Sequence, residues 1–357
     1  MNAANRIAYI DVMRGLAILF VIYHHIMVFV LGKWPADSVI MSVVHLVMMP
    51  IFFFISGFLL HKSVNGCFTS NTFREKAIKR IVVQLYPTVV FFLLFISFKG
   101  LGLRDSIYAG GKAGYWFTFS AIEYFFLMAP VLLFLSSKGI VPKWGQGLTV
   151  SIYGALIISF FYLICAGKQE LRGLLEYQPV IRFFPFYIMG IVSSLYSQAF
   201  FKMASSRIWA FFCLCIFLAI YNGLIPLRNE IIEQTAGFFE LFVIFFIFTK
   251  LYELRYIAAC RLSQWMQKLG GLTLEIYLLH YFMIEALKGI VNTKWLVSLL
   301  NTVWEFPVFM GMSLIIALCC IAFTMLLDKL GLKKFIFPKS ANFSLKLPHF
   351  GLLKRNA

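Results

Sequence analysis

The first apolar segment, residues 7–31, constrains the fold most, because it is long enough to cross a bilayer and yet carries charge. About 20 consecutive apolar residues span the hydrocarbon core of a membrane as one helix. Asp11, Arg14, His24 and His25 lie inside this segment. Ionisable side chains at membrane depth are costly and rare, and they usually face a bundle interior. The segment therefore predicts a transmembrane helix with a functional polar face.

The spacing of Arg14 and His25 places both side chains on one face of that helix. Their separation leaves a residual rotation of roughly 20° after three turns and a rise of about 16 Å. His24 points about 80° away from Arg14. An alternative interpretation is a basic anchor near the cytoplasmic edge of the membrane and two histidines in the opposite interface.

The composition of the chain is typical of a polytopic membrane protein. Of its 357 residues 61% are hydrophobic and 13% charged, with a mean hydropathy of +0.85. A soluble domain is about half apolar and about a quarter charged. The net charge of +17 would suggest a nucleic-acid partner in a soluble protein, but no nucleic-acid-binding motif is present, and we expect none. The seven cysteines form no C-x-x-C pair, so we predict neither a metal site nor a disulfide framework.

We predict an all-α fold, a bundle of about ten transmembrane helices separated by charged, glycine- or proline-containing stretches. The predicted spans are residues 8–31, 39–61, 80–98, 116–136, 147–166, 181–199, 207–224, 236–252, 272–291 and 306–327. Lysine and arginine are about twice as frequent on one side, which places both termini in the cytoplasm by the positive-inside rule. Residues 1–330 are expected to form the membrane domain. Residues 331–357 form a basic cytoplasmic tail that either contacts anionic membrane lipid or is solvated.

Two segments contain small residues among aromatic ones. The second span has Ser56 and Gly57 between phenylalanine runs, and RFFPFYIMG, residues 182–190, ends in a glycine. Small residues let neighbouring helices approach closely, so both segments are interpreted as packing sites. A polar wall of a pocket is the alternative for Ser56.

A basic run, FREKAIKRIVVQLYP, leads into the third predicted span. Lys76 and Arg80 are four residues apart and share a helix face, and Gln84 continues that face. Cations stacked in this way suit a polyanionic ligand such as the phosphates of a nucleotide-type cofactor. Ordinary positive-inside charge explains the same residues equally well.

Two later segments carry polar residues inside apolar runs. Glu123 lies deep within GYWFTFSAIEYFFLMAP, and Trp116 shares its helix face. A buried carboxylate needs a partner or a proton. The ninth span carries a dense polar set, which predicts that it lines an aqueous cavity or the bundle interior. Its members are Glu275, Tyr277, His280 and Glu285. For His280, a structural role and a functional role are equally consistent with the sequence.

These segments, and their order along the chain, resemble the acyltransferase 3 family of multi-helix membrane proteins. The matching stretches are IDVMRGLAILFVIYHH, FFFISGFLL, KAIKR before a helix with Pro87, GYWFTFSAIEYFFLMAP, FFPFYIMG and LGGLTLEIYLLH. The resemblance implies a stand-alone O-acetyltransferase of the bacterial inner membrane. It implies acetyl-CoA as the acyl donor, a hydroxyl of a surface carbohydrate or lipid-linked glycan as the acceptor, and essential roles for Arg14 and His25.

The basic run departs from the family pattern. Family members often carry Arg-x-x-Arg before the third helix, whereas this chain has Arg74, Lys76, Lys79 and Arg80 without that spacing. Lysine does not reproduce the bidentate grip of arginine. By position in the chain, the resemblance assigns the donor phosphates to Arg74, Lys76 and Arg80.

The residues and the resemblance together give a mechanistic hypothesis. A neutral His25 takes a proton from the acceptor hydroxyl as that hydroxyl attacks the thioester. Arg14 orients a partner or stabilises negative charge. The pocket or acceptor path is expected to involve Asp11, Trp116, Glu123, Tyr277 and His280. Direct transfer and a relay through an acylated histidine, serine or tyrosine both fit. The alternative function is an exporter or flippase of a glycan or lipid-linked sugar.

Overall fold

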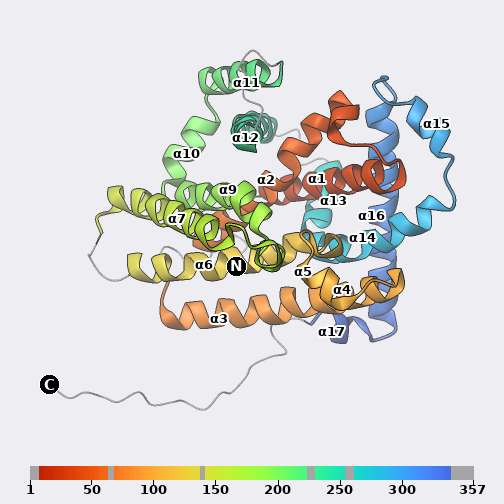
Figure 1. The fold of residues 1–357 in the computed structure, drawn as a ribbon. Coiled ribbons are helices and arrows are strands. Elements are labelled where there is room, and N and C mark those ends of the chain that lie inside the picture. Colours follow the sequence, from red (N-terminus) through yellow and green to blue (C-terminus); the bar gives the residue numbers. More distant parts are fainter. Residues whose placement is uncertain (1–7, 63–67, 137–140, 223–229, 254–260, 339–357) are drawn as a thin grey trace.

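The computed structural model describes residues 8–62, 68–136, 141–222, 230–253 and 261–338, and every regular element within these ranges is a helix (Figure 1). The predicted all-α fold is therefore confirmed. The first half of the chain contains α1 (Ala8–His25), α2 (Val39–Lys62), α3 (Ser70–Arg80), α4 (Tyr86–Lys99), α5 (Leu103–Tyr108), α6 (Trp116–Leu135), α7 (Lys143–Cys165) and α8 (Gln169–Leu174). The second half contains α9 (Tyr177–Leu195), α10 (Ser197–Ala204), α11 (Arg207–Tyr221), α12 (Glu230–Glu253), α13 (Arg261–Gly271), α14 (Thr273–Lys288), α15 (Thr293–Ser298), α16 (Glu305–Lys329) and α17 (Lys333–Ile336).

Seven helical stretches in the described part of the chain are long and apolar enough to cross a membrane. The pair α9 and α10, bent by 108°, makes an eighth if it is one span. Helix α11 is shorter, and α14 has 16 residues. Each of the ten predicted spans overlaps one of these helices. The count of ten and the sides of the two termini stay predictions.

The third span differs from its prediction because helix begins at Ser70, about ten residues before residue 80. The Thr69 hydroxyl caps this start by accepting a hydrogen bond from the amide of Thr72 at 3.2 Å. A π-helical turn, Ile81–Leu85, then joins α3 to α4. It ends two residues before Pro87, which has no amide hydrogen to give to a regular helix. The basic run is consequently the first part of one helical stretch, Ser70–Lys99.

Glycines set the closest helix contacts in the core. A Cβ at Gly57 would collide with the carbonyl oxygen of Tyr187, and one at Gly190 with the carbonyl oxygen of Phe54. These reciprocal contacts join α2 to α9, which confirms that both predicted segments are packing sites. In the same way, Gly15 of α1 lies against the backbone of α13 at Met266.

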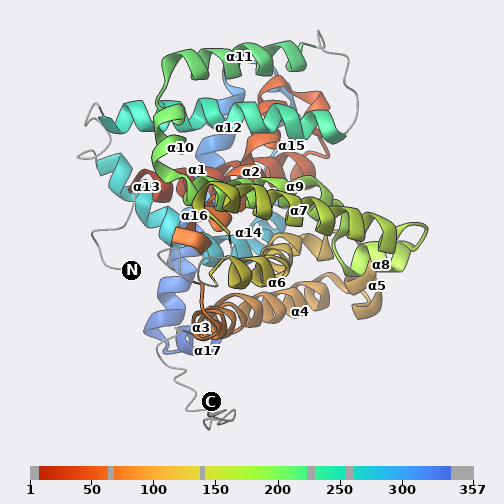
Figure 2. The same cartoon turned by 90° about the vertical axis from the view of Figure 1, so that its left-hand side faces the viewer.

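The helices near the candidate site are packed around α1. Helix α1 contacts α2, α13, α14 and α16. Both views show α11 and α12 along one edge of the molecule, with α3, α4 and α17 along the opposite edge (Figures 1 and 2). The polar residues of α1 are thus buried or half-buried within the bundle.

Candidate functional site

Helices α1 and α14 run side by side in the same direction, and two polar contacts join them. Near the start of both helices, Arg14 Nη2 donates to the Thr273 hydroxyl at 2.8 Å. Further along, His25 Nδ1 lies 2.7 Å from His280 Nε2. Because Arg14 and His25 meet the same neighbouring helix, their predicted shared face is confirmed.

The two histidines form a hydrogen-bonded pair with nearly parallel ring planes. Their ring centroids lie 5.0 Å apart and their planes differ by 10°. His280 is fully buried, and its Nδ1 lies 2.6 Å from the backbone carbonyl oxygen of Tyr277. His25 is half-buried, beside the exposed ring of Phe29. His280 is therefore fully enclosed, and His25 is the less buried residue of the pair.

Two tyrosines of α14 converge on one carbonyl beside this pair. The hydroxyls of Tyr277 and Tyr281 donate to the carbonyl oxygen of Gly114 at 2.6 and 2.8 Å. The Tyr281 oxygen also lies 3.4 Å from His25 Nε2. The connector that carries Gly114 consequently determines where Tyr281 lies against His25.

That connector has a strained backbone. Gly111, Lys112, Ala113 and Gly114 all have positive φ angles, of 90°, 39°, 51° and 100°. Each non-glycine residue in this region costs about 1–3 kcal/mol and persists only where its surroundings fix it. A Cβ at Gly114 would collide with the Tyr281 ring, so close approach also requires glycine there.

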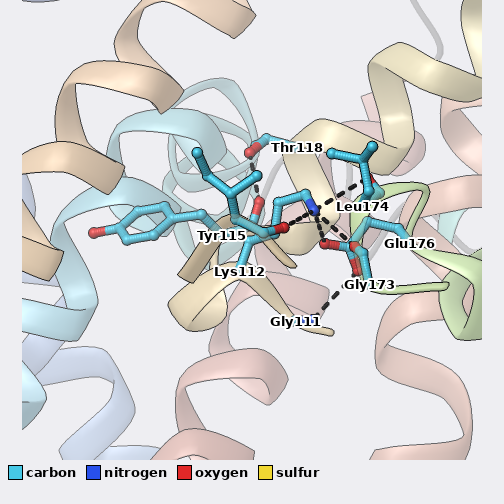
Figure 3. Close-up of polar contacts among 8 residues, drawn as sticks. Gly111, Lys112, Tyr115, Thr118, Gly173, Leu174 and Glu176 are labelled. Atoms are coloured by element: carbon cyan, nitrogen blue, oxygen red, sulfur yellow. Dashed lines mark hydrogen bonds and ion pairs between the residues drawn. The ribbon is translucent and has the colours of Figure 1, made fainter. Parts of the chain in front are cut away.

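A buried ion pair fixes the strained connector, as Figure 3 shows. Lys112 Nζ lies 3.1 Å from Glu176 Oε1 and donates to the carbonyl oxygens of Ile107, Gly173 and Leu174 at 3.0, 2.9 and 3.2 Å. The amide of Gly111 donates to Glu176 Oε2 at 3.3 Å. Burial raises the pKa of the Glu176 carboxyl above its ordinary value, and the Lys112 ammonium opposes that rise.

A cavity of about 820 Å³ lies beside Arg14, and its charged lining is mostly basic. Its basic lining residues are Arg14, Lys76, Lys79, Arg80 and Lys333, and we call it the cation cavity. Ser56, Gln84, Thr118, Thr273, Glu275 and Tyr277 supply polar lining. Tyr277 therefore contacts both the cavity and the histidine pair.

The cation cavity contains several of the predicted site residues. Arg14, Lys76, Arg80 and Tyr277 line it. Arg80 is held by hydrogen bonds to the Gln84 side chain and the Ala121 carbonyl, at 3.3 and 3.4 Å. Asp11 is nearly buried beside the cavity, with Oδ1 3.7 Å from Arg14 Nη1.

Three predicted residues lie elsewhere. Arg74 is exposed. It lies two residues before Lys76, and a helix rotates by about 200° over two residues, so Arg74 points away from the face of Lys76. Trp116 stacks on Phe183, with centroids 5.5 Å apart, in the aromatic core. Glu123 is half-buried on α6, and it does not line the cation cavity.

The structure adds residues that sequence reasoning did not select. Lys79 shares the helix face of Lys76 at a spacing of three residues, so helical periodicity could have found it. Tyr281 lies one residue after His280 in the polar ninth span. Gly114 and Lys333 carry no such signal, because their roles depend on contacts with α14 and with the cavity.

Comparison with protein families gives one match that covers most of the chain. A family model described as an acyltransferase domain matches residues 7–322. Neither the curated proteins nor the solved structures gave a match. The matched range includes both histidines of the pair and all basic residues of the cation cavity except Lys333.

Proposed function

Because the chain belongs to the acyltransferase 3 family, we propose that this integral membrane protein transfers an acetyl group from acetyl-CoA to a hydroxyl of a cell-surface or lipid-linked glycan. Family membership supports the acyltransferase role. The donor, the acceptor, the bacterial inner membrane and the cytoplasmic position of both termini are parts of the proposal.

The cation cavity suits the donor. Its volume lies within the range of about 300–1,000 Å³ that is usual for small-molecule and cofactor sites. Lys76, Lys79, Arg80 and Lys333 come from two helices that are distant in the sequence and line one space. Lysine binds phosphate as a point charge and arginine as a fork, so this set fits the phosphates of a coenzyme A ester. The apolar lining, which includes Ile18, Phe52 and Phe117, suits the uncharged remainder of the donor.

The histidine pair suits the transfer step. A general base must carry an accessible lone pair and be held in a fixed orientation. His25 is held in orientation by its bond to His280, and as a half-buried residue it is more open to a substrate than the fully buried His280. Arg14 lines the cation cavity on the same face of α1 and would stabilise negative charge on the donor or on the reacting carbonyl.

One observation carries the proposal: Tyr277 lines the cation cavity, and its carbonyl oxygen also bonds His280. A donor held by the cavity cations would therefore approach the wall behind which the histidine pair lies. A glycan exporter would have no use for a general base behind the wall of this cavity.

Mass spectrometry of the surface glycans of the native host tests the proposal. We would compare the wild type, a deletion strain, and deletion strains that carry His25→Ala or the control His61→Ala at matched membrane abundance. We expect an acetyl-sized mass increment in the wild type and the His61→Ala strain and its loss in the other two. Unchanged acylation in the deletion strain, together with reduced glycan export, would favour the exporter instead.

A further inference from the structure

We propose that His280 is a positioning residue that fixes the tautomer of His25, so that His25 Nε2 is the atom that takes the proton of the acceptor hydroxyl. This inference rests on the proposed function, because it assigns one atom of His25 to the transfer step. The two residues belong to different helices, α1 and α14, so their contact depends on the fold.

The hydrogen-bond chain starts at a group that has no hydrogen to donate. The Tyr277 carbonyl only accepts, so His280 Nδ1, 2.6 Å away, must donate to it. A neutral imidazole has one N–H group, so His280 Nε2 keeps its lone pair. His25 Nδ1 lies 2.7 Å from that nitrogen and is therefore the donor of the second bond. The hydrogen of a neutral His25 is thus on Nδ1, which leaves Nε2 unprotonated.

Tyr281 does not donate a hydrogen bond to the lone pair on His25 Nε2. Its hydroxyl has a single hydrogen, which it donates to the Gly114 carbonyl at 2.8 Å. The Tyr281 oxygen, 3.4 Å from His25 Nε2, therefore presents a lone pair to that nitrogen. In this arrangement Tyr281 does not compete with the acceptor hydroxyl for the lone pair on Nε2. It accepts a hydrogen bond from Nε2 once that nitrogen is protonated.

The arrangement gives a balanced transfer step. His25 Nε2 takes the hydroxyl proton while the acceptor oxygen forms its bond to the thioester carbonyl carbon. The carbon–sulfur bond then breaks, and the proton on Nε2 passes to the departing thiolate. His280 accepts the Nδ1 hydrogen throughout and so stabilises the transient imidazolium, as the third member of a nucleophile–base–orienter set does.

The tautomer is measured directly on the purified full-length protein in detergent, labelled with ¹⁵N-histidine. The chain has six histidines, so the signals of His25 and His280 are assigned from spectra of His25→Gln and His280→Gln. We expect both rings to be protonated on Nδ1 and unprotonated on Nε2. A His25 ring protonated on Nε2 would overturn the inference, whether or not the protein transfers acyl groups.

Kinetics of acetyl transfer separate positioning from general structural damage. His280→Leu removes the acceptor of the His25 Nδ1 hydrogen, and His280→Gln restores one through its amide oxygen. We expect kcat to fall roughly 10²–10⁴-fold in His280→Leu and to recover to within about tenfold of wild type in His280→Gln, with little change in the KM for the donor. His61→Leu, which removes a 3.0 Å contact with Ser194, is the control for loss of a histidine hydrogen bond.

The outcomes distinguish this inference from the proposed function. If His25→Ala is inactive while His280→Leu keeps the wild-type kcat, the inference is overturned and the proposed function stands. Equal losses in His280→Leu and His280→Gln would likewise overturn it, because the hydrogen-bond acceptor would then be irrelevant. Full activity in His25→Ala would reject the proposed function and this inference with it.

Discussion

At the scale of single residues, the Lys112–Glu176 pair fixes the connector that carries Gly114. The two charged groups lie 3.1 Å apart, and their side chains are 9% and 1% exposed. They hold the connector that presents the Gly114 carbonyl to Tyr277 and Tyr281. The arrangement is asymmetric, because Lys112 also satisfies three backbone carbonyls, whereas Glu176 also accepts from the amide of Gly111.

This asymmetry predicts unequal effects of removing the two partners. Lys112→Met leaves a buried carboxylate and three carbonyls without their donor, which should cost about 3–5 kcal/mol. Glu176→Gln leaves the Lys112 ammonium without a counter-ion but still bonded to three carbonyl oxygens, so we expect a smaller loss than for Lys112→Met. Thermal unfolding in detergent measures both. The exposed pair Arg104–Glu170 supplies the control Glu170→Gln, for which a small effect is expected. Equal losses in Lys112→Met and Glu176→Gln would contradict the argument.

The raised pKa of Glu176 also predicts a pH dependence. A carboxyl whose folded-state pKa exceeds its ordinary value of 4.5 contributes stability that is fully present below pH 4.5. That contribution is lost as pH rises through the folded-state pKa. The unfolding temperature of the wild type should therefore fall relative to that of Glu176→Gln as pH rises above 4.5. Parallel curves for the two proteins would show that Glu176 does not titrate as proposed.

At the scale of elements, the contact of α2 with α9 depends on two glycines. Gly57→Ala and Gly190→Ala each insert a methyl group against the backbone of the other helix, which should cost about 1–3 kcal/mol. Gly311→Ala in α16 is the matched control, because nothing lies within 4 Å of its added Cβ. We expect lower unfolding temperatures for the first two variants and an unchanged or slightly higher one for the control. Equal behaviour of all three would contradict close packing.

Helix α17 contributes to the cation cavity although it lies beyond the matched family range. Phe337 is buried and packs on Phe91, with ring centroids 5.4 Å apart, which holds Lys333 at the cavity. Lys333→Ala should raise the KM for acetyl-CoA about tenfold with little change in kcat, because a phosphate contact binds ground and transition states alike. Lys334 is exposed, so Lys334→Ala is the control. A similar rise in KM for both variants would instead indicate a general charge effect.

At the scale of the whole molecule, the sequence predicted periodic features well and long-range contacts poorly. The shared face of Arg14 and His25 follows from helical geometry, and so do the aligned cations of α3. The partners of these residues do not, because Thr273 and His280 lie more than 250 residues away and only the packing of α1 on α14 brings them near. The strained carbonyl of Gly114 has no sequence pattern beyond its glycines. Accordingly, the fold class and the placement of His25 on the polar face of its helix could be predicted, and the contact of His25 with His280 could not.

Contacts at both ends of the bundle also bear on topology. Arg14, Arg80 and Lys333 line one cavity, so the starts of α1 and α14, the end of α3 and the start of α17 meet at one end of the bundle. At the other end, Asn301 Nδ2 donates to the Asp37 carbonyl at 3.0 Å, which joins the connector after α1 to the connector before α16. The two ends contain different sets of connectors, as expected for opposite faces of a membrane protein.

Helix α14 has only 16 residues, yet its contacts indicate that it crosses between these two ends. It begins at the cation cavity, and near its other end Glu285 forms an ion pair with Lys99, at the end of α4, at a distance of 2.9 Å. It therefore extends as far across the bundle as α4 does. If α14 crosses, the connector after it lies on the side opposite the basic start of α3.

Cysteine labelling tests this crossing in intact cells that express a cysteine-free background. We expect a membrane-impermeant maleimide to label Ser298→Cys, after α14, and Ala36→Cys, after α1, because contacts of Asn301 place their connectors together. Asn71→Cys, at the start of α3, should react only after permeabilisation, since the positive-inside rule predicts that this basic helix lies in the cytoplasm. All three positions are exposed in the structure, so differences in labelling report sidedness. If Ser298→Cys reacts like Asn71→Cys, α14 does not cross, and His280 would have to reach His25 from a re-entrant helix.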